Sequence, residues 1–397
     1  MTLLNLCATL STLLFDQKES IKAKYGEKCI EMAMSVMVKY SEEKSCFVNS
    51  SSIIANIAGN NFTLGRKVGI DGIQRILYVF EKHSSHPNAC TNTLKVIVAV
   101  LPSLSKEEQE IIGKAIYDCT IKSISLHSEE ESVFNSLTLE SSSIFNEITC
   151  LRKYSTIEGV RRLFLLARQY SYNPESSGNV FRLLSCLFSE NYNVKKSVEK
   201  ESIMFMLSIL SKHSGNAWVC GNVFYAIGSF VSGLIELKEM VGTKGFDEVV
   251  SAAQSFTSVG WVSQYALYAL GNIVNGVPSL KQYAQNNTEA ASLIQTILEE
   301  HPQDEEVSKW AKGTLTKIYD VANINEILLE FQEMKEQWVL NAKLISFVTE
   351  CDSPFTNVWF AMQDVLEFLE PNIFSIITEA RENTVEIELS ASKKLRT

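Results

Sequence analysis

The chain contains 397 residues, 46% of them hydrophobic, and carries a formal net charge of −10. This hydrophobic content is ample for a large core, yet no run of residues approaches the roughly 18 uninterrupted apolar residues of a membrane-spanning helix. A nucleic-acid-binding protein normally carries a basic stripe, and this sequence has none. We therefore predict neither a membrane nor a nucleic acid as partner.

The first segment, residues 1–15, is apolar enough to suggest a signal peptide. It has no Lys or Arg before its apolar part and no clear small-residue cleavage site, which argues against secretion. We predict that it forms the first helix of the fold.

An apolar segment recurs along the chain at steps of 43 residues. Residues 222–233 are nearly repeated at 264–276, and Gly228 and Gly271 are 43 residues apart. Each copy has apolar residues at positions i, i+3, i+4 and i+7, the pattern of a helix with one buried face. A fixed period of this size is typical of stacked helical units. The further copies lie at residues 10–15, 53–59, 94–100, near 137, at 179–188 and at 310–318.

Two other helices are predicted between successive copies. A middle helix follows each copy by about twenty residues, at residues 70–77, 111–116, 157–164, 203–207 and 290–298. A short leading helix fits residues 64–68 and 280–284. One unit therefore reads as a short helix, a middle helix and a long helix.

The prolines keep the same register. Pro87, Pro174 and Pro302 precede long helices, whereas Pro102 and Pro278 follow them. Proline is excluded from helix interiors, so it collects at the boundaries between units.

The period fades after about residue 320. We predict a capping region at residues 321–381, which covers the open end of the stack, and a polar tail at 382–397. Residues 301–397 hold 17 acidic and 9 basic side chains, a net charge of −8. This acidity can favour a basic partner, but a solvated helical face is the simpler interpretation. The helices predicted here are residues 324–348, 358–369 and 373–380.

Nine cysteines are scattered along the chain without any CxxC pair. Their odd number and wide spacing predict reduced thiols inside the cell. We expect a cytoplasmic protein and leave a nuclear location open.

The unit resembles the armadillo repeat, on the segments 269–273, 55–58 and 68–73. Residues 269–273 match the end of the family's third helix, and 68–73 look like its glycine-containing turn into the middle helix. The resemblance covers roughly residues 5–320, although HEAT repeats have a similar period. It implies an all-α fold, a right-handed armadillo-type α-solenoid of about seven to eight three-helix repeats over residues 1–320, with the helical cap after it.

The resemblance also points to a binding surface on the third helices. Importin-α-like adaptors carry an aromatic residue there and an Asn four residues later, on one helix face. Tyr268 and Asn272 occupy these places, as do Tyr225 and Ser229 one unit earlier. In the family these helices line a concave groove, and an Asn there can hold a partner's backbone by donor and acceptor. The alternative is that the two tyrosines fill the contact between units. The predicted partner-binding residues are Asn56, Arg182, Tyr225, Ser229, Tyr268 and Asn272.

The sequence contains little that indicates catalysis. It has no P-loop, GxSxG or HExxH motif, and Gly242-Thr243-Lys244-Gly245 reads as a loop between helices. His83, His86 and Cys90 form an HxxHxxxC cluster, but zinc would need a fourth ligand. His127, His213 and His301 are isolated near predicted loops. We expect no enzyme, no cofactor and no metal.

We therefore predict a protein–protein interaction adaptor that binds a peptide or domain in the groove of the solenoid. Two alternatives come from the same resemblance. An importin-α-like nuclear import adaptor would bind basic peptides. An armadillo-type chaperone cofactor would bind the ATPase lobe of a heat-shock chaperone and promote nucleotide exchange.

Overall fold

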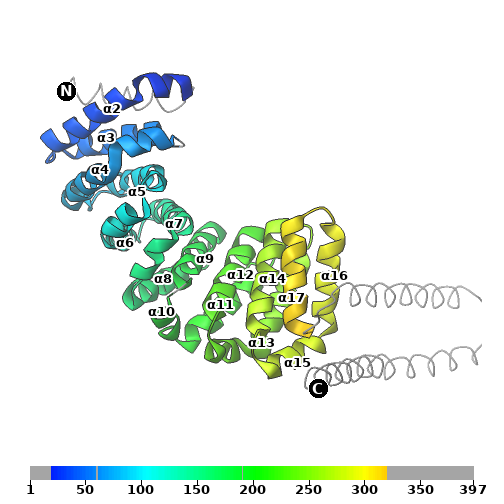
Figure 1. Cartoon of the computed structure of the whole chain (residues 1–397). Helices are drawn as coiled ribbons and strands as arrows, with labels where there is room; N and C mark the ends of the chain where they lie inside the picture. Colours follow the sequence, from blue (N-terminus) through cyan, green and yellow to red (C-terminus); the bar gives the residue numbers. More distant parts are fainter. Residues whose placement is uncertain (1–18, 60, 190, 320–397) are drawn as a thin grey trace, which may run out of the picture. The chain divides into compact units, whose positions relative to one another are not determined.

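The computed structural model describes residues 19–59, 61–189 and 191–319, and this part of the chain is helical and contains no strand (Figure 1). Helices occupy every predicted helix position between residues 53 and 318, so the prediction of an all-α fold is confirmed for these residues. The predicted first helix, the capping region and the polar tail lie outside the described residues. None of the described helices is long and apolar enough to cross a membrane.

One set of helices, which we call the row helices, recurs at a regular interval. Among the described residues each row helix begins 43 to 45 residues after the previous one and packs against the next. The row helices are α3 (Lys44–Ala58), α5 (Pro87–Val100), α7 (Glu131–Glu147), α9 (Pro174–Phe188), α12 (Ala217–Val231), α14 (Gly260–Val274) and α17 (Glu305–Tyr319).

The other helices lie between row helices in the sequence. The longer ones are α2 (Glu19–Lys39), α4 (Phe62–His83), α6 (Lys106–Leu126), α8 (Ile157–Gln169), α11 (Lys200–Lys212), α13 (Ile235–Ala253) and α16 (Thr288–Glu300). The shorter ones are η1 (Leu101–Ser103), η2 (Thr149–Tyr154), α10 (Tyr192–Lys196), η3 (Gln254–Phe256) and α15 (Pro278–Gln285).

The ends of these helices follow from local chemistry. Pro87, Pro174 and Pro278 begin α5, α9 and α15, where a proline costs no helical hydrogen bond. The side chain of Asn216 caps α12 by accepting a hydrogen bond from the Val219 amide at 3.0 Å. The prolines thus mark unit boundaries as predicted.

Two helices are sharply bent at a glycine. Gly69 in α4 has φ 61° and ψ −175°, and Gly242 in α13 has φ 61° and ψ −165°. This backbone region is essentially restricted to glycine. The predicted turn at 68–73 is confirmed by Gly69. The loop predicted at Gly242-Thr243-Lys244-Gly245 is a kink at Gly242 between two helical stretches of α13, and Thr243, Lys244 and Gly245 are helical.

Most histidines connect neighbouring units, and His127, His213 and His301 lie at helix ends, next to loops as predicted. In each case Nε2 bonds a backbone carbonyl 42 to 44 residues earlier in the chain. Stacking brings each carbonyl to a histidine at a helix end, a contact invisible to local sequence patterns. The pairs are His83 with Ser41 (2.8 Å), His127 with Ser84 (2.9 Å), His213 with Ser171 (2.8 Å) and His301 with Thr257 (2.7 Å).

Two buried lysines bind the ends of row helices in the later part of the chain. Lys195 Nζ donates to the Ser232 carbonyl at 2.9 Å, and Lys238 Nζ donates to the Asn275 carbonyl. These carbonyls end α12 and α14, where the helix dipole favours a positive charge. Burial lowers the pKa of the Lys195 ammonium to about 8. Lys195 thus connects α10 to the end of α12, and Lys238 connects α13 to the end of α14, each within one unit.

Candidate protein-binding surface

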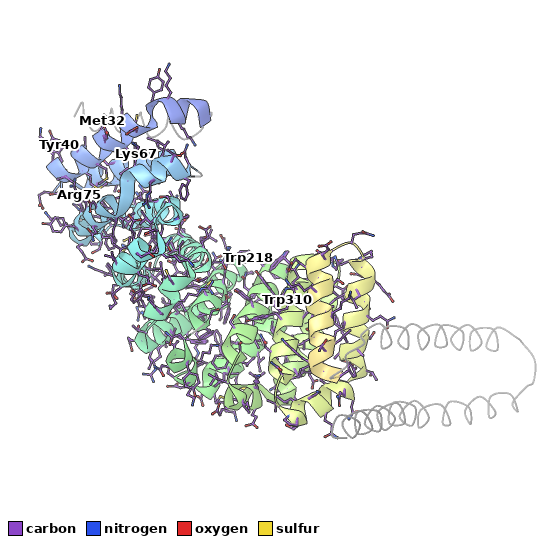
Figure 2. The ribbon with its side chains drawn as sticks, viewed as in Figure 1. Met32, Tyr40, Lys67, Arg75, Trp218 and Trp310 are labelled. Carbon is purple, nitrogen blue, oxygen red and sulfur yellow. The ribbon has the colours of Figure 1, made fainter. Side chains whose placement is uncertain are left out.

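Aromatic side chains from three successive row helices form one connected group. The helices α12, α14 and α17 lie side by side in this order (Figure 1). We call the group the aromatic ladder, and Figure 2 labels the member Trp218 on α12 and the member Trp310 on α17. The ladder consists of Trp218 and Tyr225 on α12, Trp261, Tyr265 and Tyr268 on α14, and Trp310 on α17.

The rings contact one another from α12 to α14. The centroids of Trp218 and Trp261 are 6.2 Å apart, and those of Trp261 and Tyr265 are 5.8 Å apart. Tyr265 stacks on Tyr225 with 4.7 Å between centroids and 13° between ring planes. Stacked and edge-to-face pairs at these distances stabilise one another beyond simple burial. The α12 and α14 rings therefore hold each other in place.

The contacts continue to α17. The Tyr225 and Tyr268 centroids are 5.7 Å apart, and Tyr268 meets Trp310 edge-to-face at 5.3 Å. The pair Tyr268–Trp310 repeats the pair Tyr225–Tyr265 one unit further along. The ladder is therefore produced by the same period as the helices.

Glycines on the preceding helix set the position of the larger rings. A Cβ at Gly178 would come within 2.2 Å of the Trp218 ring, and one at Gly221 within 2.2 Å of the Trp261 ring. Real Cβ atoms do not approach other atoms so closely, so these rings lie directly over the backbone of α9 and α12. The glycines fix where each indole lies.

The ladder is only partly covered by the rest of the described chain. Trp261 is 38% exposed, and the other five rings are half-buried. Burial raises the pKa of the Tyr225 hydroxyl to about 12 and also raises that of Tyr265. Both hydroxyls are therefore neutral at pH 7. The Tyr225, Tyr265 and Tyr268 hydroxyls have no hydrogen-bond partner among the described residues, so they can donate to a bound molecule.

Two positive charges lie beside the ladder. Neither α12 nor α14 contains any Asp, Glu, Lys or Arg. The Arg182 guanidinium, on α9, lies 5.7 Å from the Trp218 ring centroid. Lys317, on α17, donates to Asn272 Oδ1 at 3.4 Å. The surface combines large rings with cationic groups at its two sides.

The structure brings five of the six predicted site residues to this region. Tyr225 and Tyr268 belong to the ladder, and Arg182 lies against it. Ser229 is 1% exposed, and its hydroxyl has no hydrogen-bond partner in the described part of the chain. Asn56 is the exception, because it lies on α3, which packs on α2, α4 and α5.

The predicted role of Asn272, holding a partner's backbone, needs a side-chain amide with free donor and acceptor groups, and the structure places this amide differently. It is 8% exposed, its Nδ2 donates to the Gly228 carbonyl at 3.3 Å, and its Oδ1 accepts from Lys317. Both the nitrogen and the oxygen of its side-chain amide are therefore hydrogen-bonded inside the protein. The binding roles of Asn272 and the other predicted site residues remain predictions.

Sequence reasoning missed Trp218, Trp261, Tyr265 and Trp310. A signal was present for the first two, because Trp218 and Trp261 are 43 residues apart, as are Gly178 and Gly221. Tyr265 and Trp310 are 45 residues apart, because α17 begins 45 residues after α14. Because this last interval is longer, a search at a fixed step of 43 residues does not find Trp310.

The described residues hold no group of three or more His, Cys, Asp or Glu side chains that could bind a metal ion. In the HxxHxxxC cluster, His83 bonds the Ser41 carbonyl and Cys90 Sγ bonds the Ser84 carbonyl at 3.2 Å.

Comparison with known proteins finds no family model and no curated protein that matches this chain. The ladder is therefore the candidate protein-binding surface of the described residues.

Proposed function

We propose that this chain is a non-enzymatic adaptor of the armadillo type and that it binds a segment of a partner protein on the aromatic ladder. One observation carries the proposal: six partly exposed rings from three successive helices form a continuous surface beside free tyrosine hydroxyls. Tyr and Trp provide large contact area and a polar handle, and they are enriched at the energetic centres of protein interfaces.

The regular packing supports the solenoid part of the proposal. Row helices begin every 43 to 45 residues, and each packs on the next. The bent glycines Gly69 and Gly242 are 173 residues apart, about four of these intervals. In a stack of this kind each unit contacts chiefly its neighbours, and one face of the stack offers a long surface to a partner.

The charges favour a general adaptor over an import adaptor for basic peptides. A site for Lys- and Arg-rich peptides needs acidic side chains beside its rings, because like charges across an interface are unfavourable. The helices α12 and α14 supply no acidic residue, and Arg182 and Lys317 beside the ladder are positive. Glu306, four residues before Trp310 on α17, is paired with Lys309 at 3.6 Å. No observation favours the chaperone-cofactor alternative.

We also propose a cytoplasmic location. The cysteines in the described residues are all free thiols, and most are buried. Free buried thiols are typical of proteins in a reducing compartment.

A photo-cross-linking experiment tests the binding role. Gln264 lies on α14 between Trp261 and Tyr268, and it is half-buried. A photoreactive amino acid at position 264 should cross-link one partner in native cell extract, identified by mass spectrometry. Trp261→Ala combined with Tyr265→Ala should reduce this cross-link at least tenfold, because interface aromatics carry much of the binding energy.

The matched control is Tyr78→Ala on α4, which removes an aromatic ring that is 66% exposed and lies outside the ladder. This variant should cross-link as the wild type does. An equal yield from the wild type and the Trp261/Tyr265 variant, with both folded by circular dichroism, would reject the ladder as the binding surface.

A further inference from the structure

We infer that the segment bound by the aromatic ladder carries an anionic side chain that pairs with Arg182 and apolar side chains that cover the rings. This inference rests on the proposed function and adds the chemistry and length of the bound segment. The anionic group is either a carboxylate or a phosphate ester, since a guanidinium binds both through paired hydrogen bonds.

The Arg182 charge faces the ladder. Its guanidinium lies over the Trp218 ring at 5.7 Å, an arrangement that holds the side chain by cation–π attraction. Burial raises the pKa of the Tyr265 hydroxyl, and the nearby Arg182 charge opposes part of that rise. Arg182 is thus close to rings of both α12 and α14, at the start of the ladder.

The described residues supply no carboxylate to Arg182. Other cations on the surface are paired, such as Arg66 with Glu108 at 2.6 Å and Arg161 with Glu199 at 3.7 Å. The one acidic residue of α9, Glu175, is seven positions from Arg182, which is about 10 Å along a helix. A half-buried guanidinium stacked on an indole without a carboxylate partner attracts an anionic ligand and repels a cationic one.

The ladder also sets the length of the bound segment. From α9 to α17 there are three steps between packed helices, each of about 8–10 Å, or roughly 25–30 Å in total. An extended chain advances about 3.3 Å per residue, so roughly eight residues span this distance. The anionic residue lies at the Arg182 end. Proline or aliphatic side chains lie over Tyr225, Tyr265 and Tyr268, because aromatic surfaces bind such extended segments well.

A synthetic array of octapeptides tests this chemistry. Seven positions vary among Pro, Leu, Val and Ala, and one end position carries Glu, phosphoserine, Gln or Lys. Full-length wild-type protein with a fluorescent label should bind the Glu or phosphoserine peptides about tenfold better than the Lys peptides. The ratio between Glu and phosphoserine identifies which anionic group the site prefers.

A charge reversal provides the decisive comparison. Arg182→Glu should exchange the preference, so that Lys peptides bind best, whereas Arg75→Glu, the same change at an exposed site on α4, should leave it unchanged. An unchanged preference in Arg182→Glu, or a preference of the wild type for Lys, would overturn the inference. Trp261→Ala should lose binding to all peptides. Equal binding by Trp261→Ala and the wild type would instead reject the ladder as the site, and with it the proposed function.

Discussion

The early and late row helices have the same spacing but present different side chains at equivalent positions. Steps of 43 residues place Val96 on α5, Leu139 on α7, Arg182 on α9, Tyr225 on α12 and Tyr268 on α14. Val96 is fully buried and Leu139 is 37% exposed, and neither lies in a ring cluster. The row helices therefore pack without aromatic residues at these positions. The late row helices α12 and α14 thus carry large rings at positions where α5 and α7 carry aliphatic side chains.

The two regions also differ in their contacts between units, although exposed ion pairs occur in both, such as Lys196 with Glu236 at 3.9 Å in the late region. The early units carry exposed ion pairs across unit boundaries, such as Lys122 with Glu81 and Lys153 with Glu110 at 3.0 Å. The late units are joined by the ladder, and the buried Lys195 and Lys238 bind helix-end carbonyls within their own units. Exposed ion pairs contribute little and are screened by salt, whereas buried contacts are not.

The largest effect is expected where the backbone and the ladder meet. Gly221→Ala places a Cβ about where the Trp261 ring now lies, so the indole must move and its contact with Trp218 is lost. We expect a loss of about 1–3 kcal/mol in the free energy of unfolding, as for other overpacked sites, and loss of partner cross-linking. Urea denaturation measures the first effect, and the position-264 cross-link measures the second.

The control for this change is Gly215→Ala. A Cβ at Gly215 meets no atom within 4 Å, so the free energy of unfolding should change by less than about 1 kcal/mol. A stable Gly221→Ala protein that still cross-links would show that the ladder tolerates displacement of Trp261. The difference between the two regions would then not depend on ring geometry.

A smaller effect is expected from pH at the buried Lys195 of the late region. The pKa of Lys195 is about 8 in the folded protein and about 10.4 in an unfolded chain. Between these values the unfolded state binds more protons, so this lysine makes the free energy of unfolding rise with pH. Lys195→Met should remove that rise. Urea denaturation at pH 7.5, 9 and 10 measures it.

The comparison for this prediction is Lys122→Met in the early region. Lys122 is exposed, so its removal should leave the slope between pH 8 and 10 as in the wild type. An identical slope in Lys195→Met and the wild type would mean that the Lys195 ammonium is not desolvated in the folded protein.

The sequence allowed prediction of the features that depend on local periodicity. Helix positions follow from the apolar pattern of residues close together in the chain, whereas the turn at 68–73 was predicted from the resemblance to the armadillo repeat. Contacts between units are different, because they join residues about 40 positions apart. The bonds of His127 and His213 to carbonyls of the preceding unit could not be seen in a local pattern.

The same reason explains the mixed result for the candidate site. Tyr225 and Tyr268 could be placed on the right helix face, since helical geometry fixes that face. Whether a side chain there is free depends on its neighbour from the next unit. Lys317 and the Gly228 carbonyl occupy both ends of the Asn272 amide, and neither is near it in sequence.

The smallest predicted effect is a difference between the two regions in how strongly salt changes the cost of a substitution in the free energy of unfolding. Lys122→Ala removes an exposed ion pair with Glu81, so it should cost about 0.2–1 kcal/mol in the free energy of unfolding at low salt. In 1 M NaCl the Debye length falls to about 3 Å, and the cost should nearly vanish. Tyr265→Ala in the ladder removes a stacked ring, so its cost should persist in 1 M NaCl. Urea denaturation of both variants at the two salt concentrations measures the contrast. If both costs fall equally with salt, charge rather than ring contact stabilises the late units, and the distinction between the regions fails.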